Sequence, residues 1–120
     1  MTCYLIEIST GRLKELFLSM EQTICFVGHT HLLELISFDG EEVTRAPLCE
    51  GRSLIQRDQG YIINVGSVGQ PRDGNKTAKY VVWDDCSNSI ETRFIPYDIA
   101  STARKILELG YPKSNARRLW

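Results

Sequence analysis

The dipeptide Asp39-Gly40 lies between two strand-like stretches and constrains the fold more than any other feature of the sequence. Asp-Gly in this setting is the strongest short-range signal of a β-hairpin. The preceding stretch covers residues 32–38, and the following stretch covers residues 41–46. We therefore expect these segments to pair as antiparallel neighbours, which places an antiparallel sheet in the first half of the chain.

The rest of the chain contains short apolar runs between turn residues, with one helical pattern near each end. Apolar residues at spacings of three and four predict a helix over residues 11–21, with Thr10 as its N-cap. A second helix is expected over residues 98–109, with Asp98 as its cap. Further strands are expected over residues 23–27, 52–57, 61–65, 79–83 and 90–97. Two helices and about six strands predict an α+β fold with a mainly antiparallel sheet.

The composition bounds the class of protein. A length of 120 residues, with 42% hydrophobic and 24% charged residues, is typical of one folded domain. The net charge of -1 gives no electrostatic argument for nucleic acid or an anionic membrane. No apolar run approaches the ~18 residues of a membrane span, so we expect a cytoplasmic protein. The four cysteines lack the Cys-x-x-Cys spacing of metal and redox motifs, and Cys25, within an apolar run, is expected to be buried.

Both histidines of the chain occur in Gly28-His29-Thr30-His31, directly after the apolar run 23–27. Side chains two residues apart in an extended segment point to the same side. Neutral imidazole is a ligand for divalent first-row metals. The pair is therefore a candidate metal site. The alternative is a chance pair in a turn, with each ring bonded to backbone carbonyls.

The second distinctive segment is the glycine-rich run 64–74, which follows the predicted strand 61–65. Such loops can turn backbone N–H groups toward a phosphate. This one lacks the motifs of a nucleotide P-loop and of a dinucleotide-binding fold. Arg72 has the planar fork that suits phosphate, although a surface arginine in a turn is the alternative interpretation.

Three segments, in this order along the chain, resemble one family. They are Gly28-His29-Thr30-His31, the run 64–74 (Asn-Val-Gly-Ser-Val-Gly-Gln-Pro-Arg-Asp-Gly) and Pro96-Tyr97-Asp98 before the final helix. Together they resemble the C-terminal half of a calcineurin-like metallophosphoesterase, of the small bacterial and archaeal phosphodiesterases akin to the diadenosine tetraphosphatase group. The resemblance covers about residues 10–119. It implies a single partial domain over residues 1–120, with 1–9 and 111–120 peripheral, equivalent to about half of a four-layer α/β/β/α sandwich.

The resemblance also implies a chemistry. Metal-activated water would hydrolyse a phosphate-ester small molecule: a phosphomonoester, a phosphodiester or a dinucleoside polyphosphate. A complete site would hold two divalent metal ions (Mn, Fe, Zn or Ni), with His29 ligating one and His31 the other. The residues of the second segment that would contact the substrate or shape the site are Asn64, Gly66, Ser67 and Arg72.

The family's earlier motifs, Asp-x-His, Gly-Asp-x-x-Asp and Gly-Asn-His-Asp/Glu, do not occur in the sequence. No catalytic residue is identifiable in this segment, so we expect it to be inactive alone. It would be a fragment, one product of a split gene, or a remnant that does not catalyse. An uncovered sheet edge would favour a homo-oligomer or binding of the missing N-terminal half.

Other interpretations remain open. A non-catalytic interaction or oligomerisation module of the same fold would explain the missing ligands. A cupin-like protein would bind one metal through His29, His31 and Glu34, although its second histidine motif is absent. The basic tail formed by Arg104, Lys113, Arg117 and Arg118 is interpreted as a solvated helix end and gives no support for nucleic-acid binding.

Overall fold

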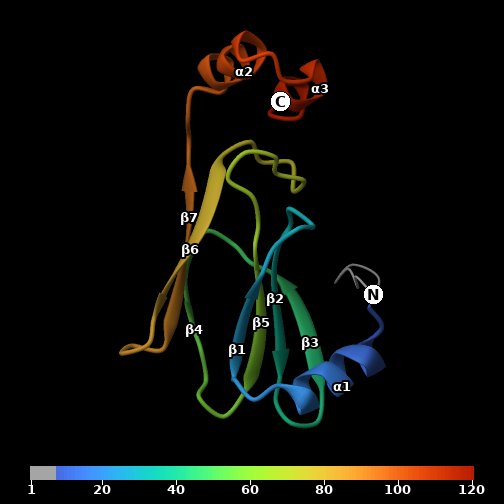
Figure 1. Ribbon diagram of the computed structural model, residues 1–120. Helices are drawn as coiled ribbons and strands as arrows, with labels where there is room; N and C mark the ends of the chain where they lie inside the picture. The colour runs from blue at the N-terminus through green and yellow to red at the C-terminus, as the bar shows by residue number, and fades with distance from the viewer. Residues whose placement is uncertain (1–7) are drawn as a thin grey trace.

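A computed structural model describes residues 8–120, in which two β-sheets face each other and a helix covers one outer face (Figure 1). Every segment predicted as a strand forms a strand. The elements in order are α1 (Thr10–Ser19), β1 (Ile24–Val27), β2 (Leu33–Phe38), β3 (Val43–Pro47), β4 (Gly51–Leu54), β5 (Gly60–Val65), β6 (Ala78–Asp84), β7 (Ser89–Ile95), α2 (Ile99–Glu108) and α3 (Lys113–Arg117). The expected α+β class is therefore confirmed. The third helix was not predicted. Most of the segment 1–9, expected to be peripheral, lies outside the described residues.

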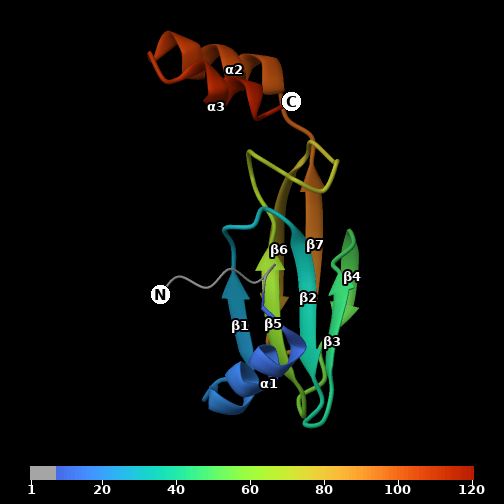
Figure 2. The same ribbon diagram turned by 90° about the vertical axis from the view of Figure 1, so that its right-hand side faces the viewer.

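The four-stranded sheet has the order β1-β5-β2-β3, and the three-stranded sheet has the order β4-β7-β6 (Figure 2). The pairing of β1 with β5 is parallel, and the other pairings are antiparallel. The predicted hairpin at Asp39-Gly40 is confirmed, with Phe38 opposite Val43. Asp39 Oδ1 closes its turn by accepting hydrogen bonds from the backbone N–H groups of Glu41 (2.8 Å) and Glu42 (2.7 Å).

The hydrophobic core follows the two-residue period of the strands. On β5, Tyr61 and Ile63 face the interior between the sheets, whereas Ile62 faces α1. The buried residues between the sheets are Leu33, Leu48, Ile55, Tyr61, Ile63 and Ile90. The buried residues between α1 and the four-stranded sheet are Leu13, Phe17, Ile36, Phe38 and Ile62.

Helix α1 begins one residue earlier than the sequence pattern suggested. Its N-cap is Ser9, whose Oγ accepts a hydrogen bond from the backbone N–H of Arg12 at 3.3 Å. The prediction of Thr10 as the cap is wrong, because Thr10 is already helical while Ser9 has the extended backbone of a cap residue. Ser9 and Thr10 both have a hydroxyl group that could cap the helix, and the backbone conformation makes Ser9 the cap.

Strand β1 is an edge strand, and this corrects the prediction for Cys25. Cys25 and Phe26 are exposed, because β1 pairs with β5 on one side and the described residues place no strand on its other side. The Phe26 ring lies 6.0 Å from the ring of Trp83, on the edge strand β6 of the other sheet. An apolar run alone does not distinguish an edge strand from a central one.

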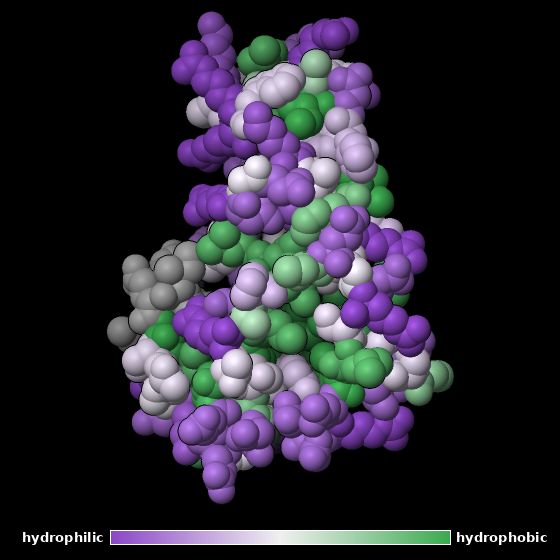
Figure 3. Space-filling view, turned by 180° about the vertical axis from the view of Figure 1, so that it is seen from behind, coloured by the Kyte–Doolittle hydropathy of each residue, from purple (hydrophilic) through white to green (hydrophobic). Residues whose placement is uncertain are grey.

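The helices α2 and α3 lie beyond the end of the two sheets in both views (Figures 1 and 2). Asp98 caps α2 as predicted, since its Oδ1 accepts a hydrogen bond from the N–H of Ser101 at 2.8 Å. The pair has a small core of its own, formed by Ala103, Ala116 and Leu119. Seen from behind, hydrophobic residues gather across the middle of the molecule and hydrophilic residues predominate at its two ends (Figure 3). None of the helices among residues 8–120 is long and apolar enough to cross a membrane.

Candidate metal centre

Both histidines lie in the short connection between β1 and β2, beside the long connection between β5 and β6. The parallel strands β1 and β5 end at the same edge of the sheet, which brings the two connections together. The backbone N–H of Arg72 donates a hydrogen bond of 3.2 Å to the carbonyl of His31. The structure therefore places the two distinctive segments of the sequence side by side.

The histidines have an unusual backbone conformation. The φ angles of His29 and His31 are 78° and 62°, and Asn88 is the other non-glycine residue among 8–120 with a positive φ. The prediction that the pair lies on an extended segment is wrong, because β1 ends at Val27 and a bend follows. A left-handed backbone costs a non-glycine residue roughly 1–2 kcal/mol. Strain of this kind is concentrated at functional sites, where the surrounding structure imposes it.

The ring of His31 is oriented by the neighbouring loop. Its Nδ1 lies 2.8 Å from the carbonyl oxygen of Gln70. Because a carbonyl only accepts, Nδ1 must donate, and the neutral ring then carries its lone pair on Nε2. This is the arrangement that metal-binding histidines use, and for His31 it is also the ring-to-carbonyl bond expected of a histidine pair in a turn. His31 is half-buried and His29 is exposed.

Asn64 lies beneath this bend and shapes it. It is 1% exposed, and its Nδ2 donates a hydrogen bond of 2.5 Å to Oγ1 of the buried Thr30, the residue between the histidines. Its Oδ1 accepts from the N–H of Gly66 at 3.3 Å. The side chain therefore holds both connections together and does not reach the surface.

Gly66 and Ser67 form the first turn of the long connection. Gly66 has a φ of 74°, and a Cβ atom there would lie 2.9 Å from Leu33 Cγ. Ser67 Oγ accepts hydrogen bonds from the N–H groups of Gly69 (3.3 Å) and Gln70 (2.9 Å). This turn positions the Gln70 carbonyl that accepts from His31.

Sequence reasoning missed the contribution of Lys79. Its side chain is fully buried, and its Nζ donates to Asp73 Oδ1 (3.0 Å), to the Asn75 carbonyl and to the Thr77 carbonyl (3.3 Å). It also lies 5.2 Å from the centroid of the Phe94 ring. A lysine at an inward position of an apolar strand is the signal that could have identified it. Lys79 fixes the second half of the connection between β5 and β6.

Arg72 differs from the other predicted residues of the loop. Its side chain is exposed and makes no hydrogen bond or ion pair with the described residues. Its guanidinium group is therefore available to an anionic ligand.

Two imidazoles suit divalent metal ions, but they form only part of a ligand set, since a catalytic zinc site normally has three protein ligands. Within residues 8–120, no group of three or more potential ligands includes a histidine. Glu34 is committed elsewhere, because both its carboxylate oxygens accept from Arg45 at 2.8 and 2.9 Å, which raises the pKa of Arg45. This pairing argues against Glu34 as the third ligand of a cupin-like site.

A separate cluster of potential ligands occurs in the described residues of the β6–β7 turn. It consists of Asp84, Asp85 and Cys86, all exposed. Asp84 Oδ1 accepts from the N–H groups of Cys86 (3.0 Å) and Ser87 (3.2 Å). Hydrogen bonds from Ser87 lower the pKa of Asp84. These hydrogen bonds are those of an ordinary turn, and they account for the closeness of the three side chains without a metal ion.

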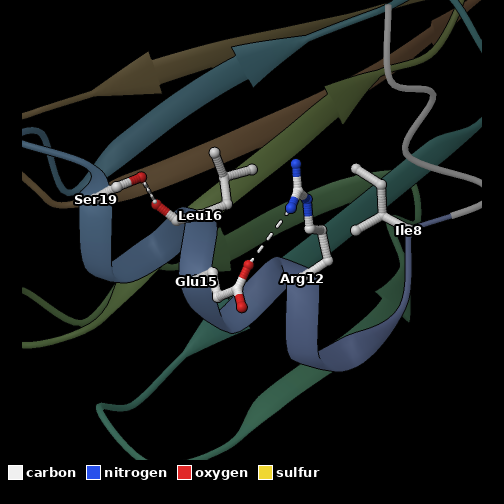
Figure 4. Close-up of a pocket in the computed structure, with 5 residues that line it drawn as sticks. All are labelled: Ile8, Arg12, Glu15, Leu16 and Ser19. Atoms are coloured by element: carbon white, nitrogen blue, oxygen red, sulfur yellow. Dashed lines mark hydrogen bonds and ion pairs between the residues drawn. The ribbon is translucent and has the colours of Figure 1, made fainter. Parts of the chain in front are cut away.

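Two surface pockets are lined by residues other than the two histidines. A pocket of about 400 Å³ follows α1, at the other end of the sandwich, and contains the exposed ion pair between Arg12 and Glu15 at 3.7 Å (Figure 4). Residues lining it are Ile8, Arg12, Glu15, Leu16 and Ser19. An open groove of about 470 Å³ starts at Leu32, the residue after His31, and is lined by Leu32, Leu33, Glu34, Arg45, Ala46, Pro47 and Asp73. The groove, and not the α1 pocket, adjoins the candidate metal centre.

Comparison with solved structures identifies the fold. The chain has the fold of about half of a metallophosphoesterase. A crystal structure of a metallophosphoesterase from Sphaerobacter thermophilus matches with a TM-score of 0.77 and 34% sequence identity, over 93% of this chain and 47% of that one.

An archaeal protein is similar in sequence. The uncharacterised protein MJ0912 of Methanocaldococcus jannaschii is 38% identical over 97 residues, which are 81% of this chain and 38% of that protein. No protein-family model matches the chain. The chain thus spans less than half the length of either of these relatives.

Proposed function

We propose that this chain forms part of a two-metal phosphoesterase site in which His29 and His31 are metal ligands. The hydrogen bond from His31 Nδ1 to the Gln70 carbonyl carries the proposal, because it leaves Nε2 as the free ligand atom. The left-handed backbone of both histidines and the metallophosphoesterase-like fold support it. The substrate class is a phosphomonoester, phosphodiester or dinucleoside polyphosphate.

The residues of this chain would have distinct tasks. His29 and His31 would each contact one divalent ion, Mn, Fe, Zn or Ni, and Arg72 would bind the anionic substrate. Asn64, Gly66 and Ser67 would position these groups through the contacts described above. The metal ions would supply the activated water nucleophile and charge stabilisation.

The proposed site needs further ligands. The additional carboxylate or imidazole groups would come from the missing N-terminal half, as part of the same polypeptide or of a separate one, or from another copy in a homo-oligomer. We therefore expect little or no hydrolysis of bis(p-nitrophenyl) phosphate by the chain alone, and weak but specific metal binding.

Metal binding tests the proposal directly. Isothermal titration with Mn²⁺ and Zn²⁺ should show saturable binding that His31→Ala weakens by about tenfold or more, the typical cost of losing a ligand group or its support. His29→Ala should weaken it as well. Circular dichroism of each variant would verify that the fold is retained.

The exposed cluster in the β6–β7 turn provides a matched control. Asp84→Asn removes a potential ligand of the other candidate cluster and should leave metal affinity unchanged. Binding that is lost in Asp84→Asn and retained in both histidine variants would refute the assignment of His29 and His31.

A further inference from the structure

A small pocket separates the loop before β6 from the residues that follow α3. Its volume is about 80 Å³. Since a water molecule occupies roughly 30 Å³ of liquid, this is room for a group of phosphate size and not for a whole ligand. The loop contributes Gly74, Asn75 and Lys76, and the chain after α3 contributes Arg118 and Trp120.

The cations of the pocket have no acidic partner among the described residues. Neither Lys76 nor Arg118 takes part in an ion pair there. The nearby carboxylate of Asp73 is bound to the buried Lys79 at 3.0 Å. Residues 98–120 contain five basic and two acidic residues, although the whole chain has a net charge of -1. The pocket is therefore lined by two cations that no described acidic side chain pairs with.

Two residues that line this pocket have backbone N–H groups without a described acceptor. The N–H groups of Gly74 and Lys76 donate to no described residue. Gly74 has a φ of 78°, and the N–H of Asn75, which lies between these two groups, is bonded to Asp73 Oδ1 at 3.1 Å. Cations and unpaired N–H groups together have the chemistry of a phosphate site.

An indole lies at the edge of the same pocket. Trp120 is 60% exposed, and Lys76 Nζ lies 5.9 Å from the centroid of its ring. The cation–π contact keeps the ammonium group of Lys76 beside the pocket. The exposed surface of the indole offers a platform on which a planar aromatic group can stack.

The pocket shares its loop with the candidate metal centre. Pro71 lines the pocket, and it stands between Gln70 and Arg72, both of which make hydrogen bonds to His31. One molecule with several phosphate groups could therefore contact both the pocket and the candidate metal centre.

We propose that this pocket binds a terminal phosphate group of a nucleoside phosphate. Lys76 and Arg118 contact the phosphate group, and the indole of Trp120 stacks against the base. That this molecule is also the substrate rests on the function proposed above.

Nucleotide binding can be tested without metal. In a Trp83→Phe background, Trp120 is the sole indole, and its fluorescence should be quenched saturably by ADP in the presence of EDTA. Lys76→Ala and Arg118→Ala should each weaken ADP binding about tenfold, the usual effect of losing one charged hydrogen bond. Adenosine, which lacks the phosphates, should bind more weakly by a similar factor.

Lys113→Ala and Arg104→Ala are matched controls, because each removes one exposed charge from α2 or α3 outside the pocket. They should leave ADP binding within about twofold of the parent, as expected of screened surface charges. Absence of saturable quenching, or equal losses in the pocket and control variants, would overturn the proposal. Metal titration of the same samples keeps the two proposals separate, since either kind of binding can fail without the other.

Discussion

At the scale of single residues, the candidate site depends on a few backbone conformations and buried contacts. Asn64, Gly66 and Lys79 each fix part of the two connections without reaching a ligand themselves. Their role is to place the ring of His31 and the loop beside it. Substitutions at these positions should therefore change stability and site geometry together.

Gly66→Ala should lower the free energy of unfolding by about 1–3 kcal/mol, because the new methyl group meets Leu33 and the left-handed backbone is strained. Urea denaturation measures this change. Gly69→Ala is the control in the same loop, since its Cβ would lie 3.8 Å from Leu119, an ordinary contact. A loss of equal size in both variants would contradict the assignment of strain to Gly66.

At the scale of elements, the sequence predicted local structure well. The hairpin at Asp39-Gly40 and the Asp98 cap are set by neighbouring residues, and both are confirmed. The parallel pairing of β1 with β5 joins segments that are far apart in the chain, so no local sequence pattern predicts it. The five-residue helix α3 was missed because Pro112 suggested an end and not a new beginning.

The candidate site likewise has features that the sequence predicted and features that it did not. The histidine pair and the glycine-rich run were recognised from residue types, and the structure brings them into contact. The left-handed bend at His29 and His31 was not foreseen, because only the packing of the two connections imposes it. Lys79 was overlooked because its partners lie in a loop whose path the sequence does not reveal.

The β2–β3 turn predicts a pH dependence. The N–H groups of Glu42 and Glu41 lower the pKa of Asp39 in the folded state. The turn therefore contributes stability above the unfolded pKa of about 4, and this contribution is lost as the pH falls through the folded value. Asp39→Asn should thus be less stable than the parent near pH 6, with the difference shrinking at lower pH.

Denaturation at several pH values, with Asp58→Asn as a control for an exposed aspartate in another turn, measures this effect. A stability difference between Asp39→Asn and the parent that stays constant down to about pH 2.5, well below the usual aspartate pKa, would contradict the stated role of the carboxylate.

At the scale of the whole molecule, the chain is elongated and open on one side. Its radius of gyration is 16.5 Å, compared with roughly 14 Å for a compact domain of this length. The edge strands β1 and β6 are both without a second neighbour among the described residues, and Phe26 and Trp83 are about half exposed between them. Such edges and apolar side chains favour association.

We expect the protein to associate at micromolar concentration, with a light-scattering mass above the 13.7 kDa of one chain. Phe26→Lys and Trp83→Lys should reduce this association by placing charges at the open side. Leu18→Lys, at an exposed position on α1, is the control and should have no such effect. A stable monomer over the whole concentration range would contradict the expectation.

The left-handed backbone at His29 has a consequence for selection experiments. Glycine adopts this conformation without strain, so a library selected for stability alone should enrich glycine over histidine at position 29. A second selection, for retention on an immobilised-metal resin, should instead favour histidine at both positions. Opposite enrichments from one library would show that this bend exchanges folding stability for metal affinity.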